Sequence, residues 1–375
     1  VILCTGGGSG LFYVNDNPPQ VTGDGYVLGF RAGSALVGIE MIDFQAMCCA
    51  PEELFGFAPH PTGFINAGAV FRNREGEEFL KRYFPDTAEK STRSEVILAM
   101  AKEIHAGRAG LTGGIFMDAT KVPFETIQKQ IPHVYKTCLR RGIDITKTPL
   151  EVAPGSHTWL GGVEIDINGR TQVPGLLAAG ETAGGIHGGN RIGGSALSAS
   201  MVFGRRAGRA AAAEVRAEGS NGPSPAIFPE QERAWLGQLL DRRDGPLQGD
   251  VLQGCKMLAH ETLGPLRDGA GCAKAYREFE RIERDVIPTM RLADDARSSD
   301  KIRGQELESA LGVRNLALLG LLLGTAALKR EESRGAHYRL DFPEQDDGHW
   351  RVVTRLHRGN GGGIDFQTDP VKNHD

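Results

Sequence analysis

The segment spanning residues 175–197, GLLAAGETAGGIHGGNRIGGSAL, limits the folds open to this chain more than any other stretch. An apolar run predicts a buried strand that ends at Glu181, and a glycine-rich loop with His187 and Arg191 leads into a helix predicted over residues 198–218. Glycines let the backbone approach a flat ligand, and a helix N-terminus offers free N–H groups. We predict a ligand site here, with Glu181 accepting hydrogen bonds from ribityl or ribose hydroxyls.

A second glycine cluster lies in the first ten residues, VILCTGGGSG. The apolar run predicts a strand, and Gly6, Gly7 and Gly8 predict a tight turn after it. The cluster does not match the dinucleotide-binding pattern GxGxxG, because Leu11 stands where the third glycine belongs. Taken alone, it is compatible with a phosphate or cofactor contact and equally with a plain tight turn.

Three polar residues elsewhere have simple structural explanations when each is taken alone. Asp24, in VTGDG, lies close to a predicted helix start, where a cap is favoured. His157, in SHTWLGG, is best explained as a structural histidine with satisfied hydrogen bonds. Arg93, in TRSEV, is best explained as half of an exposed ion pair with a near glutamate such as Glu95.

Composition excludes several classes of protein. The 375 residues carry a net charge of −4, which argues against a nucleic-acid binder. Six cysteines occur without a CxxC or histidine-spaced zinc pattern, which indicates reduced thiols in a cytoplasmic protein and no metal site. The longest apolar run, residues 310–328, contains Arg314 and Asn315, so it predicts a buried helix rather than a membrane span.

Hydrophobic periodicity predicts a mixed α/β chain. Helices are predicted along an apolar-periodic run from Val27 to Leu36, over residues 92–106 and through most of 229–334. Strands are predicted at 113–120, in a pair near the C-terminus, in a hairpin over 69–79, and along 163–167 with the Asn168-Gly169 dipeptide as a hairpin turn. Residues 219–224 are a linker by composition.

Six motifs occur in a fixed order: VILCTGGGSG, VTGDG, RSEV, SHTWLGGVEID, PGLLAAGETAGGIHGGNRIGGSALSASMVFGRRAG and ESRGAHYRLDFPEQDD. In this order they strongly resemble the flavoprotein subunit family of succinate dehydrogenase and fumarate reductase, which also holds L-aspartate oxidase and adenylylsulfate reductase. The resemblance covers nearly the whole chain, and residues 175–208 are its most specific part.

The resemblance implies an α/β fold with a Rossmann-like FAD-binding domain, an inserted α+β capping domain and a C-terminal helical domain. The expected boundaries are 1–45 and 146–216 for the two parts of the FAD domain, 46–145 for the capping domain and 225–375 for the helical domain. The family's dinucleotide-binding βαβ unit with GxGxxG belongs before residue 1, so the FAD domain is expected to be incomplete and the chain truncated at its N-terminus.

The resemblance also implies roles for particular residues. Arg93 matches the arginine that serves the family as proton donor, and because a guanidinium is an unusual acid, it needs a neighbour that resupplies its proton. The substrate carboxylate is expected at His157 and Arg191, with His60 as a further candidate, since arginine binds a carboxylate through two hydrogen bonds. FAD is expected at Gly6, Gly7, Gly8, Asp24, Glu181, Ala196 and Leu197.

One region departs from the family pattern. The family has an HPTG motif after a Val-Gln pair and a later Thr-Glu pair before an Arg-Gly-Glu-Gly-Gly segment. Here Ala46 stands where the histidine is expected, and His60-Pro-Thr-Gly comes later, without a Thr-Glu pair in the loop that follows. One carboxylate clamp and the proton relay of the family are therefore not accounted for.

The function expected is hydride transfer between flavin N5 and a small carboxylate of the succinate or fumarate type. The alternatives are an L-aspartate oxidase-like or adenylylsulfate reductase-like flavin subunit, and an inactive fragment unable to hold FAD alone. An iron–sulfur electron-transfer subunit is expected as partner, with no nucleic acid and no direct membrane span. The expected location is cytoplasmic, or peripheral at the inner face of the cell membrane through the partner.

Overall fold

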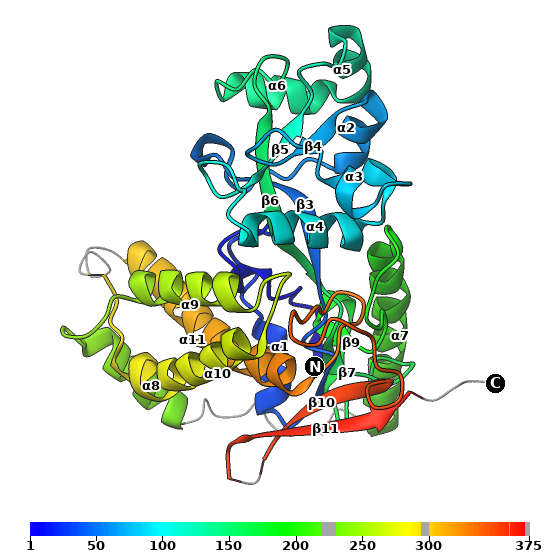
Figure 1. Ribbon diagram of the computed structural model, residues 1–375. Coiled ribbons are helices and arrows are strands. Elements are labelled where there is room, and N and C mark those ends of the chain that lie inside the picture. The colour runs from blue at the N-terminus through cyan, green and yellow to red at the C-terminus, as the bar shows by residue number, and fades with distance from the viewer. Residues whose placement is uncertain (219–229, 294–299, 360, 372–375) are drawn as a thin grey trace. The chain divides into compact units, whose positions relative to one another are not determined.

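The computed structural model describes residues 1–218, 230–293, 300–359 and 361–371, in two compact units (Figure 1). Unit 1 consists of residues 1–13, 18–42 and 158–375, and unit 2 consists of residues 14–17 and 43–157. Helices and strands occur in both units, so the predicted α/β class is confirmed. The predicted linker over residues 219–224 lies outside the described residues.

Unit 1 contains two sheets. The smaller pairs β1 (Ile2–Leu3) in parallel with β8 (Leu177–Ala178), which joins the first glycine cluster to the strand before Glu181. The larger has the order β11-β10-β2-β7-β9, in which only β7 and β9 pair in parallel. Its strands are β2 (Leu36–Val37), β7 (Gly162–Glu164), β9 (Ala183–Gly184), β10 (Val352–Arg358) and β11 (Ile364–Pro370).

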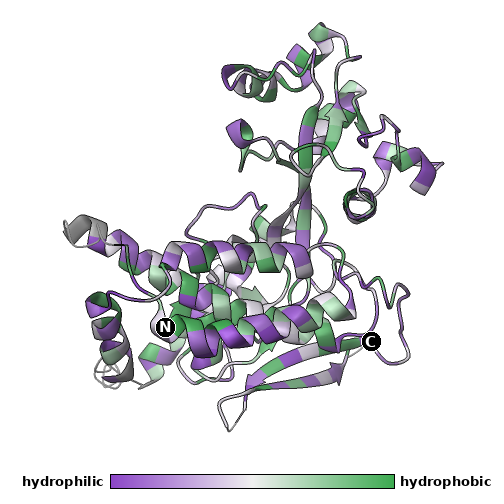
Figure 2. Cartoon of the chain, turned by 60° about the vertical axis from the view of Figure 1, so that its left-hand side comes forward, coloured by the Kyte–Doolittle hydropathy of each residue, from purple (hydrophilic) through white to green (hydrophobic). Residues whose placement is uncertain are grey.

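Six long helices complete the described part of unit 1: α1 (Asp24–Arg31), α7 (Ser195–Glu218), α8 (Glu230–Asp241), α9 (Gln248–Thr262), α10 (Gly269–Arg281) and α11 (Asp300–Lys329). Hydrophobic and hydrophilic residues alternate along the outer helices, as on amphipathic helices (Figure 2). Helices α10 and α11 pack closely at Gly320 of α11. A Cβ at this position would lie 2.4 Å from Phe279 Cε1 of α10. Helices α8, α9, α10 and α11 confirm the prediction that most of 229–334 is helical, as far as these residues are described.

Helix α11 contains the predicted apolar run. Arg303–Lys329 is the only segment of the described ranges that is long and apolar enough to cross a membrane, and 67% of its most apolar window is buried inside the protein. Core helices of soluble proteins pass the same test. Leu316, Leu319, Leu322 and Leu323 are at most 1% exposed, as expected for a core helix.

Unit 2 contains a four-stranded sheet, in which β4, β5 and β6 pair antiparallel, together with several helices. The strand order is β3-β6-β5-β4, with β3 (Ile42–Cys49), β6 (Leu150–Trp159), β5 (Ile115–Asp118) and β4 (Val70–Arg72). The helices are α2 (Pro61–Ala67), α3 (Leu80–Tyr83), α4 (Arg93–His105), α5 (Phe124–Gln130) and α6 (Pro132–Arg140). The predictions of a helix over 92–106 and a strand within 113–120 are confirmed by α4 and β5.

Two local predictions near the sheets are wrong. The helix that starts at Asp24 ends at Arg31 because Gly33 adopts a left-handed φ of +98°, and Leu36 lies in strand β2 instead. The predicted hairpin over 69–79 does not form, because β4 pairs with β5 and Phe79 is the residue before helix α3. A turn does occur after β4, where Gly76 N donates to Asn73 O.

The predicted strand along residues 163–167 is also shorter than expected. Strand β7 ends at Glu164, Val163 is fully buried, and Ile167 is 72% exposed rather than on the same buried face. The chain turns at Asn168-Gly169 as predicted, with Gly169 at a φ of +80° and Asp166 N donating to Arg170 O. No hairpin results, because β7 pairs with β2 and β9.

Candidate active site

Arg93, the predicted proton donor, begins helix α4 of unit 2. Thr92 caps this helix in a capping box with Glu95, which fixes the position of the first turn. Arg93 Nη1 lies 2.7 Å from Asp43 Oδ2 on strand β3. Arg93 therefore pairs with Asp43, 50 residues away in the chain, and not with the neighbouring Glu95. The Glu95 carboxylate instead accepts hydrogen bonds from Thr92 N and Oγ1.

His157 lies near the end of strand β6, in the same unit. Its Nδ1 is 2.8 Å from Asp16 Oδ2, and its side chain is 31% exposed. His60 caps helix α2, where its Nδ1 accepts from Thr62 N. Partial burial and the neighbouring charges of Arg93 and His157 lower the pKa of His60. Within unit 2, His60 thus lies near enough to Arg93 and His157 for their charges to act on it, and these three predicted residues are called the basic group below.

This basic group suits an anionic ligand. Arginine offers paired N–H donors to a carboxylate, and imidazole adds a donor or acceptor according to its tautomer. Arg93 is 28% exposed and His157 is 31% exposed, so both can meet a ligand while each is paired with an acid. Ala46, which stands where the family histidine is expected, is 2% exposed within strand β3 and offers no such group.

Unit 1 places the first glycine cluster beside Glu181. A Cβ at Gly7 would lie 2.0 Å from Glu181 Oε1, and a Cβ at Gly8 would lie 2.4 Å from Leu319 Cδ2, so a side chain at either position would require Glu181 or Leu319 to move. Glu181 Oε1 also accepts from Trp159 N at 2.8 Å. The two glycine-bearing segments that the sequence singled out therefore meet at one place.

Asp24 is the first residue of helix α1, after Gly23 in a left-handed conformation. Its Oδ1 accepts from Thr22 Oγ1 at 2.7 Å and from Asn315 Nδ2 at 2.8 Å. These bonds tie the TGDG turn to helix α11. The contact of Asp24 with FAD stays a prediction. In the structure, Asp24 also connects the start of α1 to α11 through its hydrogen bonds.

The loop that carries Arg191 is fixed in unit 1 by a distant segment. Ala336 N donates to Gly189 O at 2.8 Å, and a Cβ at Gly335 would lie 2.0 Å from the same oxygen. Gly335 has a φ of +58°, so both the close approach and the backbone conformation require glycine. Sequence reasoning did not connect these segments, which are about 145 residues apart.

Helix α7 begins at Ser195, three residues earlier than predicted, and its first turn contains Ala196 and Leu197. Leu197 is 78% exposed, and Ile192 just before the helix is 84% exposed. The first N–H groups of a helix have no partner within the helix. This exposed end can accept an anion or a carbonyl, as predicted for the two residues of its first turn.

Two acids were missed at the level of sequence: Asp16 and Asp43. Asp16 holds His157, a predicted substrate residue, and Asp43 holds Arg93, the predicted proton donor, at separations of 141 and 50 residues along the chain. The stretch NDNPP around Asp16 signals only a turn. No local pattern could have indicated these two pairs, because they form only when a turn and a helix distant in the chain pack on strands β6 and β3.

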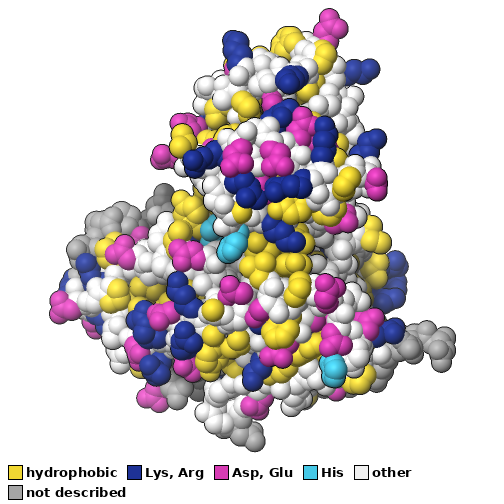
Figure 3. All heavy atoms as spheres, viewed as in Figure 1, with side chains coloured by type: hydrophobic (Ala, Val, Ile, Leu, Met, Phe, Trp, Pro, Cys, Tyr) yellow, Lys and Arg dark blue, Asp and Glu magenta, His cyan; other side chains and the backbone are white. Residues whose placement is uncertain are grey.

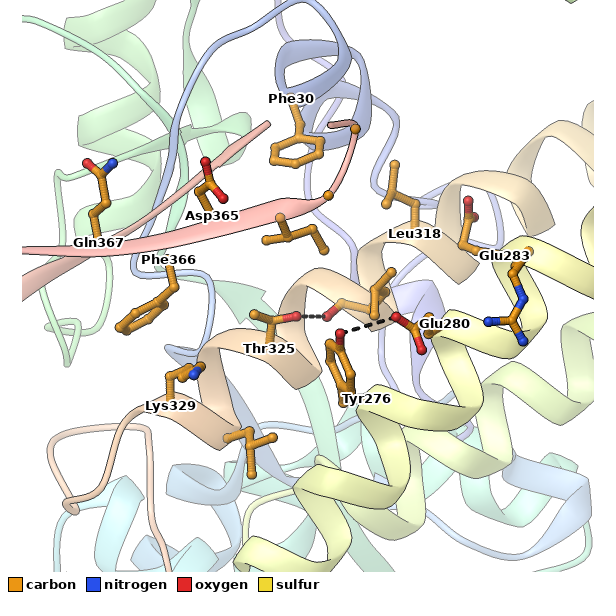
Figure 4. A pocket seen from close by; sticks show the side chains of 16 residues that line it. Phe30, Tyr276, Glu280, Glu283, Leu318, Thr325, Lys329, Asp365, Phe366 and Gln367 are labelled. Carbon is orange, nitrogen blue, oxygen red and sulfur yellow. Dashed lines mark hydrogen bonds between the residues drawn. The ribbon is translucent and has the colours of Figure 1, made fainter. Parts of the chain in front are cut away.

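A pocket of about 990 Å³ lies elsewhere in unit 1 (Figure 4). Phe30, Tyr276, Glu280 and Phe366 are among the side chains that line it, and Tyr276 donates to Glu280 at 3.2 Å. Burial raises the pKa of Glu283 at its edge to about 7. None of the predicted site residues lines this pocket, so we do not assign it to the active site.

The surface gives no sign of a nucleic-acid site on the face that Figure 3 shows. Acidic and basic side chains are interspersed there, without a continuous basic stripe. This agrees with the net charge of −4.

Comparison with known proteins decides the family. Residues 1–197 match the family model of an FAD binding domain, and residues 255–375 match the model of the fumarate reductase flavoprotein C-terminus. The chain belongs to the fumarate reductase and succinate dehydrogenase flavoprotein family. The resemblance stated from the sequence is confirmed, and FAD is the cofactor of this family.

Three similar proteins show the breadth of this flavoprotein family. The chain is 33% identical to a fumarate reductase (CoM/CoB) subunit of Methanothermobacter marburgensis over 92% of its length, and 34% identical to an L-aspartate oxidase of Caulobacter vibrioides over 92%. It superimposes on Mycobacterium smegmatis Sdh1 in complex with UQ1 with a TM-score of 0.84 and 31% identity, over all of this chain and 62% of the other. It spans 61% and 58% of the two sequence relatives.

The residues present in unit 1 fit the cofactor of this flavoprotein family. Trp159 Nε1 is buried without a hydrogen-bond partner among the described residues. The indole ring of Trp159 lies next to Gly8, since a Cβ at Gly8 would be 3.3 Å from its Cε2 atom. Gly6, with a φ of +79°, has open space on its side-chain face. Glu181 and these glycines would hold FAD, with the exposed start of α7 contributing N–H donors.

Proposed function

We propose that this flavoprotein transfers hydride between FAD and a carbon–carbon bond of a small dicarboxylate of the succinate or fumarate type. The observation that carries the proposal is the basic group of unit 2, in which His60, Arg93 and His157 lie together and Asp43 and Asp16 hold the last two. When bound, FAD would supply or accept the hydride at its N5 atom.

Arg93 is proposed to move the proton at the carbon next to the one that exchanges hydride. Before it gives up the proton, its guanidinium also stabilises negative charge that develops on the substrate, and a neighbour must then resupply the proton. The 2.7 Å pair with Asp43 orients Arg93 at the start of a capped helix. A proton transfer needs this orientation, because the donor must lie within hydrogen-bond reach of the carbon.

His157 is proposed to bind a substrate carboxylate, with His60 beside it. A charge-assisted hydrogen bond to a carboxylate is about twice as strong as a neutral one. Arg191 stays a proposal as a second carboxylate ligand, supported by its loop, which Gly335 and Ala336 hold in place. Gly6, Gly7, Gly8, Asp24, Glu181, Ala196 and Leu197 stay proposals as cofactor residues.

A second candidate reaction is oxidation of L-aspartate at its carbon–nitrogen bond. The 34% identity to a Caulobacter vibrioides L-aspartate oxidase favours it. Both substrates carry two carboxylates, so the basic group of unit 2 suits either one. The two candidates differ in which compound reacts with the flavin.

The test compares these substrates on the protein loaded with FAD, without oxygen. We expect fumarate to reoxidise chemically reduced flavin, and L-aspartate to leave oxidised flavin unchanged in the visible absorbance. Reduction by L-aspartate with no reaction of fumarate would establish the second candidate instead. If neither compound reacts faster than buffer, the proposed function is wrong.

An iron–sulfur electron-transfer subunit is proposed as the partner. The proposal rests on relatives whose names describe subunits of fumarate reductase. Copurification of a protein with an iron–sulfur absorbance spectrum from the native source would support it. A cytoplasmic or peripheral membrane location is proposed with that partner.

A further inference from the structure

The turn formed by residues 14–17 packs against the end of strand β6 in unit 2. Ser156 N donates to Val14 O at 3.0 Å, and Asp16 N donates to Ser156 O at 3.3 Å. Val14 and Cys48 are buried in a small apolar cluster beneath the turn. Two backbone bonds and an apolar contact therefore fix the turn before any side chain of the site is considered.

Asn17 adds two side-chain bonds within this turn. Its Nδ2 donates to Asp16 Oδ1 at 3.0 Å and to His157 O at 2.9 Å. One amide group thus connects the acid to the backbone of the histidine that the acid contacts. The Asp16 carboxylate, 13% exposed, is left with Oδ2 directed at His157 Nδ1, 2.8 Å away.

The contact between Asp16 Oδ2 and His157 Nδ1 determines the tautomer of His157. A carboxylate only accepts hydrogen bonds, so Nδ1 of the neutral ring must carry the hydrogen. Nε2 is then the nitrogen left to meet a ligand. When the ring is protonated, the carboxylate stabilises its charge, and Nε2–H becomes a charged donor suited to a carboxylate.

We propose that Asp16 is a positioning residue for the substrate-binding His157: it selects the Nδ1–H tautomer and places a carboxylate charge against the ring that meets the ligand. The inference rests on the proposed function only for the class of ligand, an organic carboxylate. Asp16 does not touch the substrate, and it acts through the histidine.

Two variants separate the two effects. Asp16→Asn keeps an oxygen that can accept from Nδ1 but removes the charge, and Asp16→Ala removes both. The matched control is Asp346→Asn, because Asp346 Oδ2 also lies 2.8 Å from a histidine Nδ1, that of the exposed His349. The control pair lies in unit 1, among none of the predicted site residues.

The first measurement is the nitrogen NMR spectrum of protein labelled in its ten histidines, with His157 assigned through the His157→Gln variant. We expect His157 to carry hydrogen at Nδ1 in the native protein and in Asp16→Asn, and to shift to the Nε2–H tautomer in Asp16→Ala. An unchanged His157 signal in Asp16→Ala would overturn the proposal. This readout needs neither flavin nor substrate, so it stands even where the proposed function fails.

The second measurement is steady-state fumarate reduction by the FAD-loaded protein. We expect KM to rise about 10-fold in Asp16→Asn and more in Asp16→Ala, with kcat changed less than KM, while Asp346→Asn matches the native protein. A merely structural role would lower the amount of folded protein without splitting KM from kcat. Equal KM values in all four proteins would contradict the assigned role. Should Asp16→Ala not fold, Asp16→Asn alone still decides this measurement.

Discussion

Two ionic clusters of this chain use arginine in opposite ways. In unit 1, Arg330 is 2% exposed and contacts two fully buried acids, with its Nε 2.8 Å from Glu40 Oε1 and its Nη1 2.6 Å from Glu332 Oε1. In unit 2, Arg93 and His157 are each about one third exposed and are held by one acid each. The first cluster is closed, and the second presents its cations to the solvent.

The difference explains which cluster serves the fold and which suits a ligand. Arg339 Nη1, in unit 1, donates to three backbone carbonyl oxygens, including those of Ala327 and Arg330, at 2.8 and 3.1 Å. Thr354 Oγ1 donates to both oxygens of Glu40. Buried charges with this many partners fix the segments that they join, and the exposed cations of unit 2 keep a face for an anion.

The largest effect is expected from breaking the closed cluster. Arg330→Met leaves Glu40 and Glu332 as buried acids without their shared cation, which costs about 3–5 kcal/mol of unfolding free energy. Urea denaturation followed by circular dichroism measures this loss. Arg284→Ala, which removes an exposed pair with Asp285, is the control and should leave the midpoint unchanged. Equal midpoints for both variants would contradict the contrast.

Removing Arg93 tests the open cluster. Arg93→Gln should lower kcat for fumarate reduction about 10²- to 10⁴-fold, because the proton donor is lost. The control is Arg72→Gln in the same unit, since Arg72 is 21% exposed and pairs with Asp118 and Glu78 away from the predicted site. A kcat in Arg93→Gln equal to that in Arg72→Gln would remove Arg93 from the mechanism.

The buried acid Glu283 sharpens the comparison. Glu283 Oε1 has no hydrogen-bond partner among the described residues, and burial raises the pKa of Glu283 to about 7, against 4.5 ordinarily. The folded state therefore binds the extra proton between pH 4.5 and 7, so this group's contribution to stability is present below pH 4.5 and is lost as the pH rises to 7. The full loss is about 3 kcal/mol, at about 1.4 kcal/mol for each pKa unit.

The variant Glu283→Gln tests this dependence. It should remove the fall in stability across that range, measured by urea denaturation at pH 5 and pH 7.5. Glu280→Gln, in the same pocket, is the control and should retain the native slope. If Glu283→Gln keeps the native pH dependence, the carboxyl does not titrate as its burial implies.

The smallest effect is expected at the contact between Gly335 and Gly189. Gly335→Ala introduces a Cβ 2.0 Å from Gly189 O and should displace the Arg191 loop, raising KM for the carboxylate a few-fold with roughly 1 kcal/mol of destabilisation. Gly362→Ala has a similar φ of +83° with open space, so it controls for backbone strain. Equal KM values in the two variants would show that the contact does not support Arg191.

The sequence predicted the cations of the site better than the acids that hold them. Arg93 and His157 occur in short motifs, and residues 175–197 carry a strand, loop and helix that local patterns reveal. Asp16 and Asp43 meet their cations only in folded unit 2, where the 14–17 turn bonds to Ser156 of β6 and helix α4 brings Arg93 to Asp43 on β3. Two residues that pair at a separation of 141 residues leave no periodic pattern in the sequence that would indicate the contact.

The local errors have the same origin. Leu36 continues the apolar period of helix α1, but the left-handed Gly33 ends that helix and β2 takes the residue into a sheet. Phe79 was expected to pair with β4, although β5, which lies some 40 residues further along the chain, takes that place. The partners available in the folded protein determine whether such short strands form, because two or three residues have too weak an intrinsic preference for strand over helix.

The central claim is that the open basic group of unit 2 binds the substrate's carboxylate, and succinate binding to the FAD-loaded protein tests it most directly. Calorimetric titration compares the native protein with His157→Gln and with His349→Gln, whose histidine pairs with Asp346 in the same 2.8 Å geometry outside the site. We predict a Kd about 10-fold weaker in His157→Gln and unchanged in His349→Gln. The same Kd in all three proteins would contradict the account.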